Sequence, residues 1–111
     1  MVESGYLRAL KQSLWHMLAG TRGGVTRIEI IELLRKRPYN TNQLHEELKL
    51  DYKTIQHHLK ILIDESIITS SDKNKYGNMY FLSPLFEENI RLFDEILEKI
   101  GKKQLNKGGK K

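Results

Sequence analysis

The sequence contains no cysteine, and it contains no apolar run long enough to cross a membrane. The absence of cysteine excludes disulfide frameworks, cysteine-ligated zinc sites and thiol nucleophiles. A membrane-spanning helix needs about 20 apolar residues, and a secretory signal needs an apolar segment that is also missing near the N-terminus. We therefore expect a soluble, cytoplasmic protein with no membrane partner.

The sequence also lacks the patterns that mark common catalytic sites. It has no glycine-rich phosphate loop, no metal-ligand spacing, and no serine, histidine and aspartate set in a supporting context. We therefore expect a protein that is not an enzyme and that binds no cofactor or metal.

Acidic residues are missing from the C-terminal end of the chain. The 111 residues include 19 Lys+Arg and 14 Asp+Glu, which gives a formal net charge of +5. Residues 101–111 contribute five lysines and no acid, so residues 1–100 are neutral, with 14 basic and 14 acidic residues. A basic composition is often taken as a sign of nucleic-acid binding. Here that interpretation depends on where individual charges lie, because the excess belongs to the tail.

The length, with 39% hydrophobic and 30% charged residues, predicts one globular domain. Apolar residues recur at helical spacings of three and four, and two β-branched or aromatic runs frame a polar, turn-rich loop. We expect a mainly α fold with a small β-hairpin, in which residues 1–100 form the domain and residues 101–111 a flexible basic tail that begins where Gly101 ends the last helix. The predicted helices span residues 6–19, 25–36, 41–49, 52–65 and 84–100, and the predicted hairpin spans residues 67–82.

Polar residues mark where three of these helices begin. Asn40 and Gln43 have the spacing of a capping box, in which each side chain bonds to the backbone of the other residue. Asp51 precedes the next helix as an N-cap. Ser83 followed by Pro84 is typical of a helix that begins with a serine cap and a proline in the first turn.

The second helix is predicted to end in the basic run 35–37, just before Pro38. Cations in a last turn stabilise the helix dipole, and this interpretation is favoured over a phosphate contact.

A short helix, a turn of a few residues, a second helix and a hairpin, in that order, are typical of a winged helix-turn-helix. The helix-turn-helix then covers residues 40–65, and the hairpin at 67–82 is the wing. The second helix of such a motif enters the DNA major groove, which is about 12 Å wide.

Helical geometry predicts which side chains of this second helix contact DNA. Ile55, Leu59 and Leu62 form the inward face, so the side chains on the other face, and those of the first turn, point outward. An ordinary solvated helix face is the alternative, but the tight turn and the wing favour DNA. The predicted contacts are Tyr52, Lys53, Thr54, Gln56, His57 and Lys60 on the helix, and Lys73, Lys75 and Tyr76 on the wing.

Residues 38–82 resemble the winged helix-turn-helix of ArsR-like transcription regulators. The segments that carry the resemblance are RIEIIELL at 27–34, TNQLHEEL at 41–48, LDYKTIQHHLKIL at 50–62 and ESII at 65–68. Ser66 stands where the family usually has a glycine in a left-handed conformation, which serine adopts at some cost.

The resemblance also bears on the histidines and on metal sensing. His57 occupies a position where the family often has arginine, which implies DNA contact. His58 matches the family's histidine, and we expect it to be packed and hydrogen-bonded rather than a metal ligand. The metal-sensing members use cysteine in the recognition helix or histidine and acidic pairs on the last helix, which this sequence lacks; we expect no metal site.

The first and last predicted helices carry wider apolar stripes than one small core requires. Surplus apolar helical faces favour dimerisation, and the resemblance implies a dimer through the same two helices. The alternative is that the two helices pack only on each other. An apolar pocket between them could hold a small-molecule effector of unspecified chemistry. The predicted interface residues are Leu7, Leu10, Leu14, Phe86, Ile90, Phe93, Leu97 and Ile100.

Together these patterns predict a homodimeric, sequence-specific double-stranded DNA-binding transcriptional regulator acting on a pseudo-palindromic operator. Two other functions compete with it. One is a winged helix used as a protein-interaction module, since residues 39–83 carry five basic and six acidic residues. The other is sequence-independent nucleic-acid binding driven by the basic tail.

Overall fold

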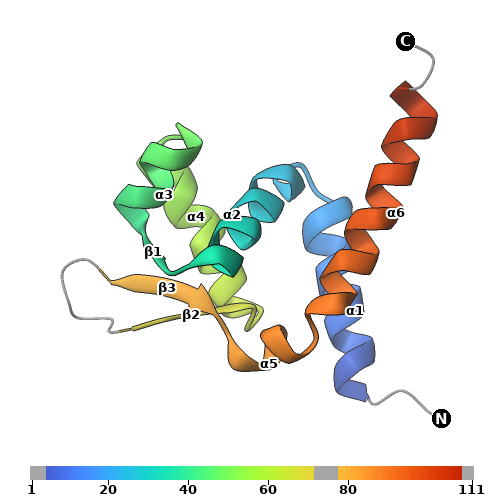
Figure 1. Ribbon diagram of the computed structural model, residues 1–111, viewed down its shortest axis with the longest axis horizontal. Coiled ribbons are helices and arrows are strands. Elements are labelled where there is room, and N and C mark those ends of the chain that lie inside the picture. Colours follow the sequence, from blue (N-terminus) through green and yellow to red (C-terminus); the bar gives the residue numbers. More distant parts are fainter. Residues whose placement is uncertain (1–4, 72–77, 109–111) are drawn as a thin grey trace.

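The structure is a computed structural model that describes residues 5–71 and 78–108. Helices dominate it, with one small sheet beside them (Figure 1). In chain order the elements are α1 (Gly5–Ala19), α2 (Gly24–Lys36), β1 (Tyr39–Asn40), α3 (Thr41–Leu48), α4 (Tyr52–Asp64), β2 (Ile68–Ser70), β3 (Met79–Leu82), α5 (Pro84–Glu88) and α6 (Ile90–Gly108). None of the helices in these two ranges is long and apolar enough to cross a membrane.

The helix starts follow the local signals in two of three cases. Asn40 Oδ1 accepts a hydrogen bond from the Gln43 amide at 2.7 Å, and Gln43 Oε1 accepts one from the Asn40 amide at 2.9 Å, which confirms the capping box. Ser83 Oγ accepts from the Phe86 amide at 3.1 Å. Asp51 stands at the N-cap of α4, but among the described residues its side chain makes no capping hydrogen bond.

The sheet has a third strand that the sequence patterns did not predict. β3 pairs antiparallel with β2 on one side, as the hairpin requires, and with β1 on the other, so the strand order is β1-β3-β2. Tyr39 lies opposite Tyr80 in this pairing. Two residues are too few to show the alternation by which a strand is recognised in sequence. This strand ties the start of α3 to the wing.

The predicted last helix is interrupted at Asn89 and extends further than expected. Asn89 Nδ2 donates to the Leu85 carbonyl at 3.0 Å, and the backbone leaves the helical conformation there (φ −117°, ψ 27°). Asparagine favours such breaks because its side chain competes for backbone hydrogen bonds. The predicted end at Gly101 is wrong: α6 continues to Gly108, since one glycine costs a helix only about 1 kcal/mol. Of the predicted tail, residues 109–111 lie outside the described part of the chain.

The terminal helices α1 and α6 lie side by side at one end of the molecule, away from α3 and α4 (Figure 1). Four of the predicted dimer-interface side chains are buried in the core of a single chain. These are Leu10, Leu14, Phe86 and Phe93, with exposed fractions of 6%, 0%, 0% and 0%. The other four, Leu7, Ile90, Leu97 and Ile100, are only partly buried against this core.

Ser66 adopts the left-handed conformation, with φ of 64°, where α4 gives way to β2. An L-residue pays about 1–2 kcal/mol in this region, and glycine pays almost nothing. We therefore expect Ser66→Gly to raise the free energy of unfolding by roughly 0.5–1 kcal/mol. This is less than the full cost of the left-handed conformation, because glycine also gives the unfolded chain more conformational freedom. Urea unfolding at an unchanged m-value measures this gain. A loss of stability would show that the serine side chain contributes more than its backbone costs.

Candidate nucleic-acid interface

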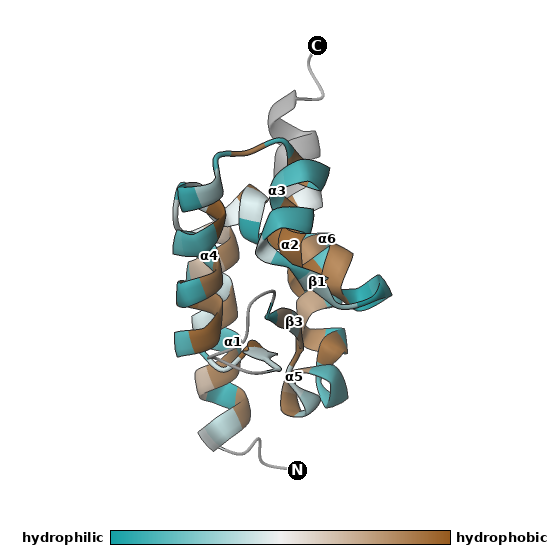
Figure 2. Cartoon of the chain, turned by 90° about the vertical axis from the view of Figure 1, so that its left-hand side faces the viewer, coloured by the Kyte–Doolittle hydropathy of each residue, from teal (hydrophilic) through white to brown (hydrophobic). Residues whose placement is uncertain are grey.

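One face of α4 is buried and the opposite face is open to solvent, as the helical spacing predicted. Ile55, Leu59 and Leu62 are at most 2% exposed. Figure 2 shows the resulting division, with the hydrophobic side of α4 turned toward α2 and its hydrophilic side turned outward. The predicted contact residues Tyr52, Lys53, Gln56, His57 and Lys60 are exposed, and Thr54 is half-buried.

The outer face of α4 borders a groove shared with the wing. The groove has a volume of about 290 Å³ and lies between α4 and Tyr80 of β3. Gln56 and Lys60 line it, together with Ile63, which is 38% exposed. The helix and the wing strand therefore present one continuous surface.

Lys60 already has an acidic neighbour on this surface. Its Nζ lies 3.2 Å from Asp64 Oδ2, one helical turn further on, and both side chains are exposed. An exposed pair of this kind contributes about 0.2–1 kcal/mol, so Lys60 can exchange Asp64 for a phosphate at small cost.

His45 holds the turn between α3 and α4, a role for which we found no sequence signal. Its Nδ1 donates to the Leu50 carbonyl at 2.6 Å, and its ring meets the Tyr52 ring edge-on with centroids 6.1 Å apart. These contacts fix the start of α4 relative to α3.

His58 is packed and hydrogen-bonded, as expected, and its partner is a buried arginine. His58 is 6% exposed and Arg27 of α2 is 4% exposed. Arg27 Nη1 lies 3.0 Å from His58 Nδ1, Arg27 Nε donates to the Met17 carbonyl at 3.1 Å, and Arg27 Nη2 donates to Thr21 Oγ1. Burial lowers the pKa of Arg27; burial and then the positive charge of Arg27 lower the pKa of His58.

Arg27 was not singled out from the sequence, although a signal was present. With Ile30, Ile31 and Leu34 it follows the spacing of the buried face of α2, so a helical projection places its side chain inward.

The tip of the wing carries the other predicted contacts, Lys73, Lys75 and Tyr76, and these lie outside the described residues. The described base of the wing closes with hydrogen bonds between Ser71 and Met79, one from the Ser71 amide to the Met79 carbonyl at 2.9 Å. The two sides of the wing are therefore still hydrogen-bonded to each other at Ser71 and Met79.

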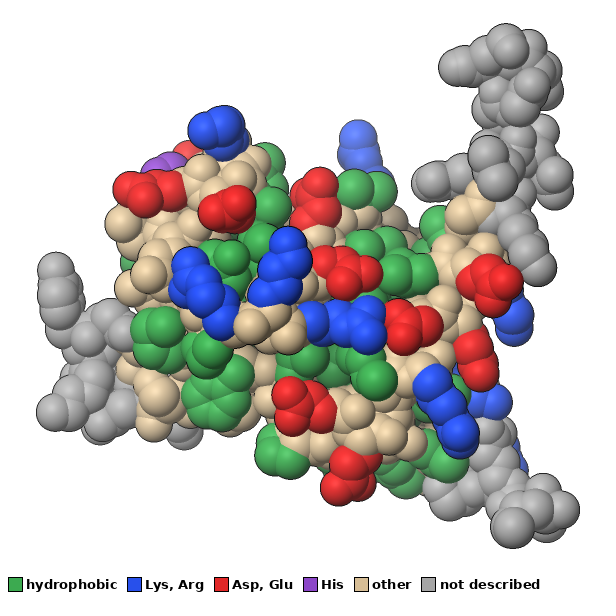
Figure 3. Space-filling view, in the orientation of Figure 1, with side chains coloured by type: hydrophobic (Ala, Val, Ile, Leu, Met, Phe, Trp, Pro, Cys, Tyr) green, Lys and Arg blue, Asp and Glu red, His purple; other side chains and the backbone are tan. Residues whose placement is uncertain are grey.

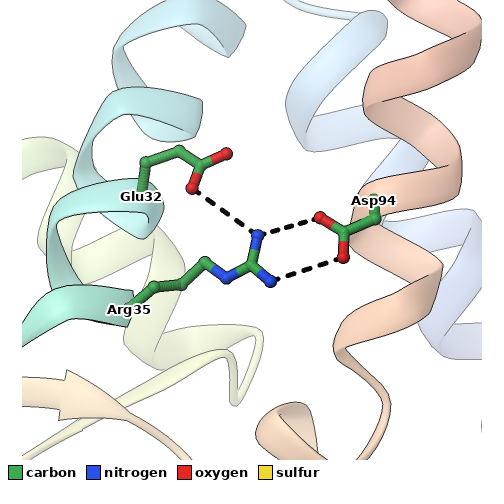
Figure 4. Close-up of polar contacts among 3 residues, drawn as sticks. All are labelled: Glu32, Arg35 and Asp94. Carbon is green, nitrogen blue, oxygen red and sulfur yellow. Dashed lines mark hydrogen bonds and ion pairs between the residues drawn. The ribbon is translucent and has the colours of Figure 1, made fainter.

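The face opposite α4 has mixed charge. Acidic and basic side chains alternate across it in Figure 3, which views the molecule from the side on which α4 is hidden. Arg35 bonds to Asp94 of α6 at 2.8 Å and lies 3.6 Å from Glu32 (Figure 4). The hydrogen bond that Arg35 donates to the Asp94 carboxylate is the main cause of the raised pKa of Arg35. Arg35 thus joins α2 to α6, a third role beside the dipole and phosphate interpretations.

The described residues do not bring three histidine or acidic side chains together as a metal site would. The exposed, cationic and amide-bearing face of α4 can instead offer hydrogen bonds to a polyanion.

Residues 24–70 match the family described as "Bacterial regulatory protein, arsR family". The match covers α2, the helix-turn-helix and β2. It confirms the predicted resemblance for this segment and supports a DNA-binding regulator. No curated protein matches the chain in sequence.

Solved structures confirm the winged-helix fold at low sequence identity. Rv0081 of M. tuberculosis is 20% identical with a TM-score of 0.63, covering 92% of this chain and 99% of that one. A probable transcriptional regulator from Pseudomonas aeruginosa is 21% identical with a TM-score of 0.64, covering 91% and 80%. Staphylococcus aureus MarR, solved with salicylate and kanamycin, is 19% identical with a TM-score of 0.61, covering 96% and 68%.

Proposed function

We propose that this protein is a homodimeric transcriptional regulator that reads a pseudo-palindromic operator by placing α4 in the major groove. The observation that carries the proposal is the division of α4: its apolar side is buried, and its polar side is exposed within the segment that matches the ArsR family. That polar side is turned away from α2 (Figure 2).

The exposed side chains fit the chemistry of base and phosphate contacts. Gln56 can pair with the N6 and N7 edge of adenine, and Lys53 and Lys60 can reach guanine edges or phosphates. Thr54 lies near the helix N-terminus, where a phosphate also meets the positive end of the helix dipole. His57 lies beside Gln56 on the exposed face and adds a donor.

The partly exposed apolar residues of α1 and α6 support the dimer. Leu97 and Ile100 line an open groove of about 500 Å³ together with Val25 and Ile28 of α2. Val25 is 61% exposed, so apolar surface beside this groove stays uncovered in a single chain. A second copy of the chain would cover this surface, and symmetric dimers read half-sites about one helical turn apart.

Selection of bound duplexes from a random DNA pool, combined with a mass measurement in solution, tests the proposal. We expect enrichment of a palindromic site, a dimeric mass, and binding that weakens steeply with salt. Absence of binding even at low salt would favour a protein-interaction module. Binding without sequence preference that disappears on deletion of residues 102–111 would favour a tail-driven nucleic-acid-binding protein.

Substitutions on α4 test the assigned face. We expect Gln56→Ala and His57→Ala each to weaken binding to the selected duplex by about 5- to 150-fold, the range of about 1–3 kcal/mol for a good base contact. Fluorescence anisotropy at one salt concentration measures the change.

Gln12→Ala and His16→Ala are matched controls, because they remove the same residue types from exposed positions on α1. They should leave both affinity and mass unchanged. Equal affinities of the α4 variants and the wild type would show that another face reads the DNA.

A further inference from the structure

Arg27 joins three helices through one side chain. Its guanidinium binds the Met17 carbonyl at the end of α1 and Thr21 in the following turn, while Arg27 itself belongs to α2. Its remaining described contact is His58 of α4, 31 residues away in sequence. Through Arg27, α4 is therefore attached to the junction between α1 and α2.

The contact defines the protonation state of His58. A guanidinium only donates hydrogen bonds, so Nδ1 of His58 must accept and must carry no proton. Protonation of the imidazole would replace this acceptor with a donor and place a second cation 3.0 Å from Arg27. The bond and a protonated His58 are mutually exclusive.

The surroundings of His58 leave the ring little freedom. A Cβ added to Gly23 would lie 2.6 Å from His58 Cε1 and 2.7 Å from Arg27 Nη1, so the turn backbone closes directly over the pair. The charged or titratable groups that the described elements bring against the ring are Arg27 of α2 and His57 of α4, whose ring centroid is 5.4 Å away. Both oppose protonation.

We propose that Arg27 and His58 are positioning residues for DNA binding: their hydrogen bond fixes α4 against the α1–α2 junction, and loss of the bond lowers affinity for specific DNA. The inference rests on the proposed function of α4. His58 lies between the exposed His57 and the buried Leu59, so its bond to Arg27 attaches the same helix that carries the predicted DNA contacts. Misplacement of a docking helix weakens every contact that it makes.

Two substitutions separate the hydrogen bond from the shape of the side chain. His58→Asn retains an acceptor near the position of Nδ1 and does not titrate, whereas His58→Leu fills the space without an acceptor. Both are made in a His57→Gln background, so that His58 is the only imidazole on α4. The probe is the duplex selected by the wild-type protein at about pH 7.5, at one salt concentration.

At about pH 7.5 we expect His58→Leu to weaken binding at least about tenfold, and His58→Asn to stay within about twofold of its parent, because only leucine leaves Arg27 without its acceptor. As the pH falls below the ordinary histidine range the parent should lose affinity, while the His58→Asn variant should not, because burial lowers the pKa of His58 and its protonation breaks the bond to Arg27. Equal affinities of the asparagine and leucine variants, or equal pH profiles of the parent and the asparagine variant, would overturn the inference.

A measurement on the free protein distinguishes this inference from the proposed function. Backbone amide exchange in α4, compared between variants at the same pH, should be faster with His58→Leu than with His58→Asn. If no duplex is enriched, the proposed function fails, and amide exchange still decides whether the bond holds α4. If the duplex binds all variants alike, the function stands and the positioning role is wrong.

Discussion

Phe93→Ala should lower the free energy of unfolding by about 3–5 kcal/mol, the usual cost of deleting a fully buried phenylalanine ring. Phe93 is 0% exposed, meets Phe86 edge-on with centroids 6.0 Å apart at 70°, and lies under the Arg35 guanidinium. Its removal leaves a cavity between α6, α5 and α2. Urea unfolding measures the loss.

The same substitution separates the core from the dimer interface. Because Phe93 is buried within one chain, the shift in unfolding midpoint should be the same at every protein concentration, and the mass of the folded protein should not change. Leu97→Ala, one turn further along α6 at a half-buried position, should act mainly on the monomer–dimer equilibrium, which depends on concentration. If Phe93→Ala lowered the free energy of unfolding only in dilute protein, Phe93 would belong to the dimer interface.

The interface prediction shows what helical periodicity can and cannot establish. The spacing of Phe86, Ile90, Phe93 and Leu97 correctly indicates an apolar stripe, yet a stripe does not reveal whether its partner is the same chain or another copy. The structure divides it: Phe86 and Phe93 face the core, while Ile90 and Leu97 are only partly covered. The break at Asn89 turns α5 away from α6, and this changes the relation between residues that a continuous helix would align.

The helix-turn-helix was predictable because its signals are local. The Asn40 capping box and the apolar spacing of α4 each depend on neighbours within a few residues, whereas the left-handed Ser66 was implied by the family resemblance. Contacts across long distances in sequence were not predictable in this way. β1 exists because β3 supplies its hydrogen bonds, and the burial of Arg27 depends on acceptors from α1 and α4.

Gly24→Ala should destabilise the protein by about 2–3 kcal/mol, the upper part of the range for adding a methyl group where there is no room. Gly24 is the first residue of α2 and is buried. A Cβ there would lie 2.1 Å from the Leu18 carbonyl oxygen and 2.8 Å from the Leu18 carbonyl carbon. Both are backbone atoms of α1, so no side-chain rotation can relieve the overlap, and the end of α1 must move.

Gly101→Ala is the matched control, because a Cβ at Gly101 meets no described heavy atom within 4 Å. Alanine should stabilise α6 there by up to about 1 kcal/mol, since glycine is the poorer helix former. The two variants therefore add the same methyl group and are expected to change stability in opposite directions. Thermal unfolding of both, at one protein concentration, gives the comparison. If Gly24→Ala were as stable as the wild type, α1 and α2 could not approach as closely as the Arg27 hydrogen bonds to Met17 and Thr21 require. The contact between Arg27 and His58 would then not explain how α4 is held.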